Sequence, residues 1–252
     1  MKVALVQFDI AWQDGAANLA TLDGLLPAGC DLVVLPEMFH CGFSMNVDEV
    51  AQSDGGSVLD WMKKSAARLN CCLTGSVAVR SMEGQLFNRL YFVYPNQEVM
   101  FYDKRHLFRM AGEHQVYTPG NQRVVVPIGE WRILLQVCYD LRFPVWSRNR
   151  NDYDAVVYVA NWPVPRRNAW RTLLQARAIE NQCYVLGVNR VGVAEGMTFQ
   201  GDTMVVDPKG VIVAETLPNE QQVLITDLDL EALMRFRERF PVWLDADPFE
   251  IR

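Results

Sequence analysis

Short apolar segments typical of β-strands alternate with amphipathic, helix-like segments along most of this chain. The strand-like segments are residues 3–8, 32–35, 72–79, 90–94, 124–126, 133–137, 155–160, 184–188, 204–207, 211–214 and 223–227. The clearest helical periodicities cover residues 168–181 and 230–237. Because buried strands must be covered by helices or by a second sheet, this order predicts a layered α/β fold.

The connecting segments add detail to this prediction. Residues 207–210, Asp-Pro-Lys-Gly, have the composition of a hairpin turn, so we expect antiparallel pairs beside βα units and therefore a mixed sheet. Ser57 and Asp60 have the spacing of a helix-capping box. No linker rich in glycine, serine or proline divides the sequence, and we expect residues 1–252 to form a single domain.

Composition and charge disfavour several classes of partner. Half of the 252 residues are hydrophobic, which allows a large core, and the net charge of -6 disfavours a nucleic-acid-binding face. No segment approaches the roughly 20 apolar residues that cross a bilayer. Gln7 and Asp9 interrupt the apolar N-terminal segment, which we therefore interpret as a strand rather than an export signal. We expect a cytoplasmic protein without a membrane or nucleic-acid partner.

The sequence has no pattern typical of cofactor binding. The six cysteines include no C-x-x-C pair, and the three histidines are not spaced with them as zinc ligands. Neither G-x-G-x-x-G nor a Walker motif is present. We expect no metal, nucleotide or other cofactor, and interpret most of the cysteines as small buried apolar residues.

Three residues with complementary chemistry lie next to strand-like segments. Glu37 follows residues 32–35, Lys104 lies in Tyr-Asp-Lys-Arg-His, and Cys138 follows residues 133–137. Active residues of α/β folds collect just beyond the carboxyl ends of strands. A thiolate is a strong nucleophile, a partly buried carboxylate can take the thiol proton, and a lysine can stabilise an oxyanion. Taken singly, each could instead be a structural residue.

The segments around these residues resemble the nitrilase superfamily of amidases, nitrilases and carbamoylases. Glu37, Lys104 and Cys138 follow the chain order of its Glu-Lys-Cys triad, and the similarity covers nearly the whole chain. Further similar segments are Val-Ala-Leu-Val-Gln-Phe (3–8), Asn-Arg-Leu (88–90), Ala-Asn-Trp-Pro (160–163), Gln-Ala-Arg-Ala-Ile-Glu-Asn (175–181) and Asp-Pro-Lys-Gly (207–210). Several linked motifs in order are more specific than any one of them.

The resemblance implies a mechanism through a cysteine thioester on a small-molecule amide. Glu37 would be the general base and Cys138 the nucleophile, while Lys104 and the backbone amide of Tyr139 would hold the oxyanion. Glu113 matches a second glutamate of the family, which would position the lysine and the substrate amide. No metal or organic cofactor takes part in this chemistry.

The resemblance also implies an αββα sandwich that dimerises into a four-layer assembly, or forms a higher homo-oligomer. The aromatic C-terminal tail, about residues 236–252, lies outside any periodic element. An exposed apolar tail favours burial against a partner subunit. The alternative is that it folds back on its own chain.

The motif Cys-Tyr-Asp-Leu-Arg-Phe-Pro and the short chain resemble the omega-amidase branch, whose members hydrolyse 2-oxoglutaramate to 2-oxoglutarate and ammonia. Tyr139 stands where true nitrilases usually have tryptophan. The distal carboxylate of such a substrate requires a cation. Candidates for this cation and for the pocket wall are Arg166, Arg167, Arg109, Phe39, Phe43 and Trp162. Arg142 is more typical of an ion pair near the nucleophile, and Arg177 of a helical pair with Glu180.

Three alternatives remain open at this point. The protein could be a carbamoylase or another aliphatic amidase of the same superfamily. It could be a papain-like thiol hydrolase in which His106 or His114 is the base, although no local protease signature is present. It could also be a catalytically silent subunit with a binding role, which the intact Glu37, Lys104 and Cys138 disfavour.

Overall fold

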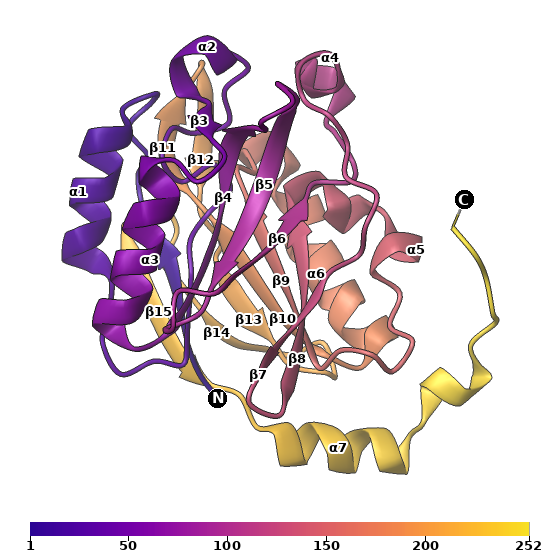
Figure 1. Ribbon diagram of the computed structural model, residues 1–252. Coiled ribbons are helices and arrows are strands. Elements are labelled where there is room, and N and C mark those ends of the chain that lie inside the picture. Colours follow the sequence, from indigo (N-terminus) through magenta and orange to yellow (C-terminus); the bar gives the residue numbers. More distant parts are fainter. Residues whose placement is uncertain (252) are drawn as a thin grey trace.

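The computed structural model describes residues 1–251, in which two β-sheets face each other and helices cover their outer faces (Figure 1). The first sheet has the strand order β15-β1-β2-β4-β5-β6, with β3 paired to β4. Its strands are β1 (Lys2–Gln7), β2 (Leu32–Val34), β3 (Gln52–Ser53), β4 (Cys72–Arg80), β5 (Leu86–Val93), β6 (Val99–Asp103) and β15 (Gln222–Asp227).

The second sheet has the order β14-β13-β10-β9-β8-β7. Its strands are β7 (Val125–Ile128), β8 (Trp131–Val137), β9 (Ala155–Ala160), β10 (Tyr184–Asn189), β13 (Met204–Val206) and β14 (Ile212–Glu215). A separate hairpin consists of β11 (Val191–Ala194) and β12 (Met197–Gln200). Strands β8, β9 and β10 pair in parallel, whereas β13 and β14 pair antiparallel across the predicted 207–210 turn. The prediction of mixed sheets is therefore confirmed.

Helices α1 and α3 cover the first sheet and α6 covers the second (Figure 1). The α-helices are α1 (Gly15–Leu25), α2 (Val47–Val50), α3 (Ser57–Leu69), α4 (Glu113–Val116), α5 (Pro144–Ser147), α6 (Arg167–Asn181) and α7 (Leu230–Arg239). The short 3₁₀ helices are η1 (Arg109–Ala111), η2 (Cys138–Arg142), η3 (Val164–Arg166) and η4 (Val242–Asp245). In α6, Trp170, Leu174 and Ala178 share one buried face, as helical periodicity requires.

Three apolar cores define the layers. Along β1, Val3 and Leu5 face a core shared by both sheets, while Ala4 and Val6 face the core beneath α1 and α3. This alternation follows from the two-residue period of a strand. A third core lies between the second sheet and α6. The layers form the αββα sandwich that the resemblance implied.

Several local features differ from the sequence-based expectation. Strand β6 and the β11–β12 hairpin were not predicted. The capping box at Ser57 and Asp60 was wrong, because α3 begins at Ser57 and its N-cap is Gly56, without a side-chain capping bond. Glycine has no side chain that could accept a hydrogen bond from the first turn of the helix.

Part of the C-terminal tail is hydrogen-bonded to the rest of the same chain. Gln182 Nε2 donates to the carbonyl of Phe240 at 2.7 Å, and Arg150 Nη2 donates to the carbonyl of Phe249 at 3.1 Å. Leu244 nevertheless keeps 63% of its surface exposed. The tail therefore combines anchored main-chain groups with uncovered apolar side chains.

Within residues 1–251, none of the helices has the length and apolarity needed to cross a membrane. In the same residues, no group of three or more histidine, cysteine, aspartate or glutamate side chains is arranged to hold a metal ion. The cytoplasmic location stays a prediction.

Candidate active site

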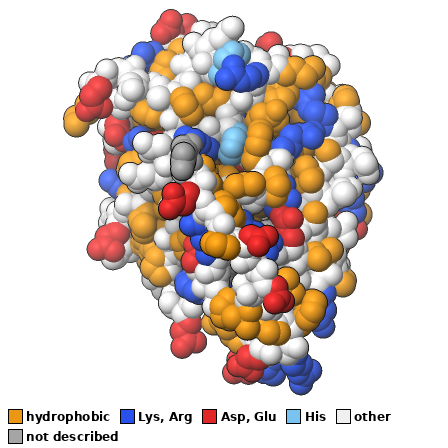
Figure 2. Space-filling view, turned by 90° about the vertical axis from the view of Figure 1, so that its right-hand side faces the viewer, with side chains coloured by type: hydrophobic (Ala, Val, Ile, Leu, Met, Phe, Trp, Pro, Cys, Tyr) orange, Lys and Arg blue, Asp and Glu red, His pale blue; other side chains and the backbone are white. Residues whose placement is uncertain are grey.

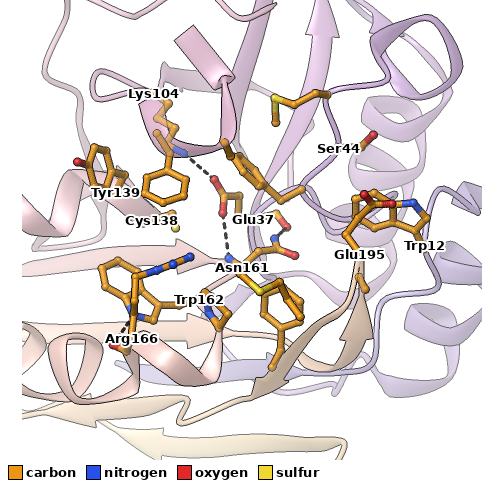
Figure 3. Close-up of a pocket in the computed structure, with 18 of the residues that line it drawn as sticks. Trp12, Glu37, Ser44, Lys104, Cys138, Tyr139, Asn161, Trp162, Arg166 and Glu195 are labelled. Carbon is orange, nitrogen blue, oxygen red and sulfur yellow. Dashed lines mark hydrogen bonds and ion pairs between the residues drawn. The ribbon is translucent and has the colours of Figure 1, made fainter.

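A cavity of about 410 Å³ lies where strands of both sheets end. Glu37 follows β2, Lys104 follows β6, and Cys138 and Asn161 follow β8 and β9; the side chains of all four line the cavity (Figure 3). The carboxyl ends of parallel strands meet at one edge of a sheet, so residues far apart in sequence converge here. The structure thus brings the three residues of the predicted triad together.

Glu37 is held in a fixed orientation by donors from both sheets. Its side chain is fully buried. Lys104 Nζ and Asn88 Nδ2 each donate to Oε1 at 2.9 Å, and the backbone N–H of Asn161 donates to Oε2 at 2.9 Å. A buried carboxylate requires such partners, because its charge is costly away from water. Glu37 is therefore positioned rigidly beside Cys138.

Lys104 lies between two carboxylates. Its Nζ is 2.9 Å from Glu37 Oε1 and from Glu113 Oε1, and 3.0 Å from Glu113 Oε2. Burial alone would lower the pKa of Lys104, but the charges of Glu113 and Glu37 outweigh it and raise the pKa above its usual value. Burial raises the pKa of Glu113, and the lysine opposes this shift. Lys104 is thus a permanent cation in the cavity wall.

Cys138 lies on a sharp turn from β8 into η2. Its φ of 43° is in the left-handed region, which a non-glycine residue adopts only when its surroundings impose it. The turn is anchored by Asp140, whose Oδ2 accepts from Val137 N–H at 3.0 Å and from Tyr102 OH at 2.8 Å. This geometry presents the thiol to the cavity.

The surroundings of Cys138 favour the neutral thiol over the thiolate. Burial, followed by the charge of Glu37, raises the pKa of the thiol well above its usual value, although Lys104 opposes the shift. A thiol with such a pKa needs a base before it can attack. Glu37 is the carboxylate that lies beside it (Figure 3).

Two asparagines that sequence reasoning did not single out orient the site. Asn88 Nδ2 contacts Glu37 and also donates to Glu113 Oε1 at 3.2 Å. Asn161 Nδ2 donates to the main-chain carbonyl of Glu37 at 2.5 Å. Both asparagines belong to segments that resemble the superfamily. For Asn88, the presence of a polar residue within an apolar strand, β5, could have indicated a functional role.

Four predicted wall residues line the cavity: Phe43, Tyr139, Trp162 and Arg166. Lys104 Nζ lies 5.1 Å from the centre of the Phe43 ring. The Arg166 guanidinium lies 5.1 Å from the Phe108 ring and extends toward Cys138 (Figure 3). The Trp162 indole N–H donates to the carbonyl of Arg166 at 2.7 Å, which fixes the end of η3 against the wall.

Phe39 does not line the cavity, which corrects the sequence-based expectation. After Glu37 the chain turns through Met38, whose φ is 44°, and Phe39 enters the core beneath α1 and α3. Gly75 makes room for it, because a Cβ at Gly75 would lie 2.8 Å from a Phe39 ring carbon. Phe39 is therefore a core residue.

The arginine predictions also need correction. Arg109 is exposed on η1, and Arg167 donates to both carboxylate oxygens of Asp202 at 2.8 Å; neither lines the cavity. Arg142 makes no ion pair within residues 1–251 and instead lines the cavity, 5.1 Å from the centre of the Trp162 ring. The predicted pair of Arg177 with Glu180 is confirmed at 2.8 Å.

The structure does not support the papain-like alternative. All three histidines lie within the described residues, and none lines the cavity. His106 Nδ1 is 2.7 Å from Asp140 Oδ1, and its ring stacks on Phe143. His106 therefore supports the turn at Cys138 from behind rather than facing the thiol.

Comparisons with known proteins agree with this geometry. The model of the carbon-nitrogen hydrolase family matches residues 2–238. The omega-amidase YafV of Escherichia coli (strain K12) is 49% identical over 256 residues, covering 100% of this chain and 98% of that protein. A 2-oxoglutaramate amidase of Bacillus subtilis (strain 168) is 33% identical, covering 96% of each chain.

A solved structure supports the same assignment. A carbon-nitrogen hydrolase superfamily protein of Xanthomonas campestris, which carries an arsenic adduct in its active site, is 43% identical and matches with a TM-score of 0.95. The match covers 100% of this chain and 99% of that one. The resemblance to the nitrilase superfamily is confirmed, and the chain belongs to the carbon-nitrogen hydrolase family.

Proposed function

We propose that this protein hydrolyses the terminal amide of 2-oxoglutaramate, or of a closely similar ω-amido acid, to the free acid and ammonia. The observation that carries the proposal is one cavity that joins the Cys138–Glu37 pair to two arginines, Arg142 and Arg166. Neither guanidinium has an anionic partner within residues 1–251. The names of the E. coli and B. subtilis relatives support this substrate class.

The reaction begins with proton transfer from Cys138 to Glu37. The thiolate then attacks the amide carbonyl, forming the sulfur–carbon bond and an oxyanion. Lys104, oriented by Glu37 and Glu113, stabilises this oxygen together with the backbone N–H of Tyr139. Asn88 and Asn161 keep the Glu37 carboxylate in place during the transfer.

Collapse of the tetrahedral intermediate breaks the carbon–nitrogen bond. Glu37 gives its proton to the leaving nitrogen, ammonia departs, and the acyl group remains on Cys138 as a thioester. Glu37 then takes a proton from water, whose oxygen attacks the thioester, and returns it to the sulfur. One carboxylate thus acts in turn as base and acid.

Arg166 and Arg142 are the proposed anchors for the distal carboxylate. The Arg166 guanidinium extends toward Cys138 and is supported by the Phe108 ring, while Arg142 packs on Trp162. Guanidinium groups bind carboxylates through two parallel hydrogen bonds. A carboxylate in this place would direct the far amide of a short dicarboxylic monoamide to the thiol.

The test is ammonia release from 2-oxoglutaramate, run beside glutamine, asparagine and a simple nitrile, with Cys138→Ala as the blank. Fast release from the keto-acid amide alone is expected. Release from none of these compounds, with Cys138 still reactive toward thiol reagents, would overturn the substrate assignment. Carbamoyl compounds would then be the next substrates to test.

We also propose that the described part of the tail, residues 236–251, packs against a second copy of the chain; residue 252 of the predicted tail lies outside the described residues. Phe240 and Leu244 keep 60% and 63% of their surfaces exposed, and apolar side chains gather on the side that carries the tail (Figure 2). Exposed apolar side chains favour association. Light scattering should give a dimer or larger oligomer that dissociates in a Phe240→Ser, Leu244→Ser variant; a monomeric wild type would contradict this.

A further inference from the structure

We propose that the half of the cavity beyond Glu37 is a subsite for a substituent on the amide nitrogen, and that it favours apolar substituents ending in a positive charge. The inference rests on the proposed function and extends it from primary to N-substituted ω-amides. It follows from the size of the cavity, its distribution of charge and the direction in which the leaving nitrogen must face.

The cavity is larger than the proposed substrate requires. Its volume of about 410 Å³ lies in the range of sites that hold drug-sized molecules, whereas a five-carbon ω-amido acid is much smaller. Besides the residues near Cys138, the lining includes the apolar side chains of Trp12, Met45, Met197 and Phe199, together with the polar Gln13, Ser44 and Asn46. Trp12 and Glu195 lie on the opposite side of Glu37 from Tyr139 and Arg166 (Figure 3). The spare volume is therefore separate from the proposed carboxylate anchor.

Charge divides the cavity into two ends. Arg166 is at one end, where Arg142 packs on the Trp162 ring, and Glu195 is at the other, without an ion pair or hydrogen-bond partner for its side chain within residues 1–251. Arg190 packs behind Phe199, but it is paired with Asp9 at 3.0 Å and does not neutralise Glu195. A substrate carboxylate is consequently attracted to the arginines and repelled from Glu195.

The reaction fixes which part of the substrate faces Glu195. Glu37 must protonate the leaving nitrogen, so this nitrogen lies on the Glu37 side of the scissile carbon. With the acyl carboxylate at Arg166, a substituent on the nitrogen extends past Glu37 toward Trp12 and Glu195. Apolar walls suit its methylene groups, and the Glu195 carboxylate suits a terminal ammonium.

Glu195 is held in place by the β11–β12 hairpin. Glu195 and Gly196 have φ values of 49° and 70°, as in the tight turns that join two antiparallel strands. At the base of the hairpin, Val191 N–H donates to the carbonyl of Phe8 at 3.1 Å. The hairpin therefore places Glu195, whose side chain is exposed, at the rim of the cavity.

Hydrolysis of an N-substituted amide at this site needs no reactant other than water. Cys138 attacks the carbonyl of the secondary amide, and the carbon–nitrogen bond breaks. The nitrogen takes the proton that Glu37 received from the thiol, so a primary amine leaves in place of ammonia. Water then hydrolyses the same thioester, with Glu37 as base.

The experiment compares N-aminopropyl and N-butyl amides of the acid whose primary amide is hydrolysed. The two substituents have nearly the same shape and differ in the terminal charge. Wild-type protein at low salt is expected to hydrolyse both, with a kcat/KM about five-fold higher for the cationic amide. Added salt should reduce this ratio, because the charge at the rim is exposed to solvent.

Glu195→Gln should bring the ratio of the two kcat/KM values close to unity. Glu83→Gln is the matched control, because Glu83 also precedes a glycine in an exposed hairpin turn but does not line the cavity, and it should keep the wild-type ratio. An unchanged ratio in Glu195→Gln would overturn the proposal. So would hydrolysis of the primary amide without hydrolysis of either N-substituted amide. If the primary amide is not hydrolysed either, the result would instead contradict the proposed function.

Discussion

Asn161 donates two hydrogen bonds to Glu37, one from its backbone N–H to the carboxylate at 2.9 Å and one from its side-chain amide to the main-chain carbonyl at 2.5 Å. The two residues follow strands of opposite sheets, β9 and β2. The contact therefore joins the two sheets beside Cys138. The orientation of the Glu37 carboxylate depends on the packing of the whole sandwich.

Asn161→Ala should lower kcat about 10- to 100-fold, because the main-chain carbonyl of Glu37 loses its donor and the carboxylate loses its alignment with the thiol. The measurement is steady-state ammonia release. Asn121→Ala, at an exposed loop position, is the control and should have wild-type activity. Wild-type kcat in Asn161→Ala would show that other contacts suffice to orient Glu37.

Glu37→Gln should lower kcat by about 10²- to 10⁴-fold, because the amide can accept hydrogen bonds but cannot take the thiol proton. His106→Gln, assayed in parallel, should keep far more activity than Glu37→Gln. Lower activity in His106→Gln than in Glu37→Gln would instead support a histidine base for Cys138.

The reactivity of Cys138 toward iodoacetamide should depend on two charges in opposite directions. Glu37 raises the pKa of the thiol, so Glu37→Gln should move the midpoint of the alkylation profile to lower pH. Lys104 lowers this pKa, so Lys104→Met should move the midpoint to higher pH. Mass spectrometry of the alkylated peptide measures both, with Cys138→Ala as the blank. Shifts of the same sign in both variants would contradict this charge arrangement.

Lys104→Met should lower the free energy of unfolding by about 3–5 kcal/mol at neutral pH, because Glu37 and Glu113 are left buried without their cation. The loss should shrink toward pH 5, since burial and the charge of Glu37 raise the pKa of Glu113 and protonation removes its charge. Urea denaturation measures it. Lys64→Met, on the exposed face of α3, should change stability by less than about 0.5 kcal/mol. An equal loss at both pH values would argue against repulsion as the cause.

Arg166→Gln should raise KM for an ω-amido acid about 10-fold or more, because a desolvated guanidinium–carboxylate contact is lost. The neighbouring Arg167→Gln should have a much smaller effect on KM, because Arg167 is paired with Asp202 and does not line the cavity. Steady-state kinetics of both variants gives the comparison. A larger increase in KM for Arg167→Gln than for Arg166→Gln would indicate that Arg167 binds the substrate carboxylate.

Local sequence was enough to predict most of the strands and helices and the family of the chain. Periodicity is a local property, so Tyr184–Asn189 and Arg167–Asn181 were predicted within one or two residues. Chemically distinctive residues after apolar segments were equally visible, as Glu37 and Cys138 show. Both kinds of signal depend only on neighbours along the chain.

Which side chains enter the cavity depends on contacts made in the tertiary structure. Phe39 turns into the core because Met38 adopts a left-handed φ and Gly75, on another strand, leaves room. Arg167 turns away because Asp202 is within reach, whereas Arg142 has no such partner within residues 1–251. Side-chain direction at the end of a strand depends on partners supplied by distant segments, and local sequence does not specify where those segments lie.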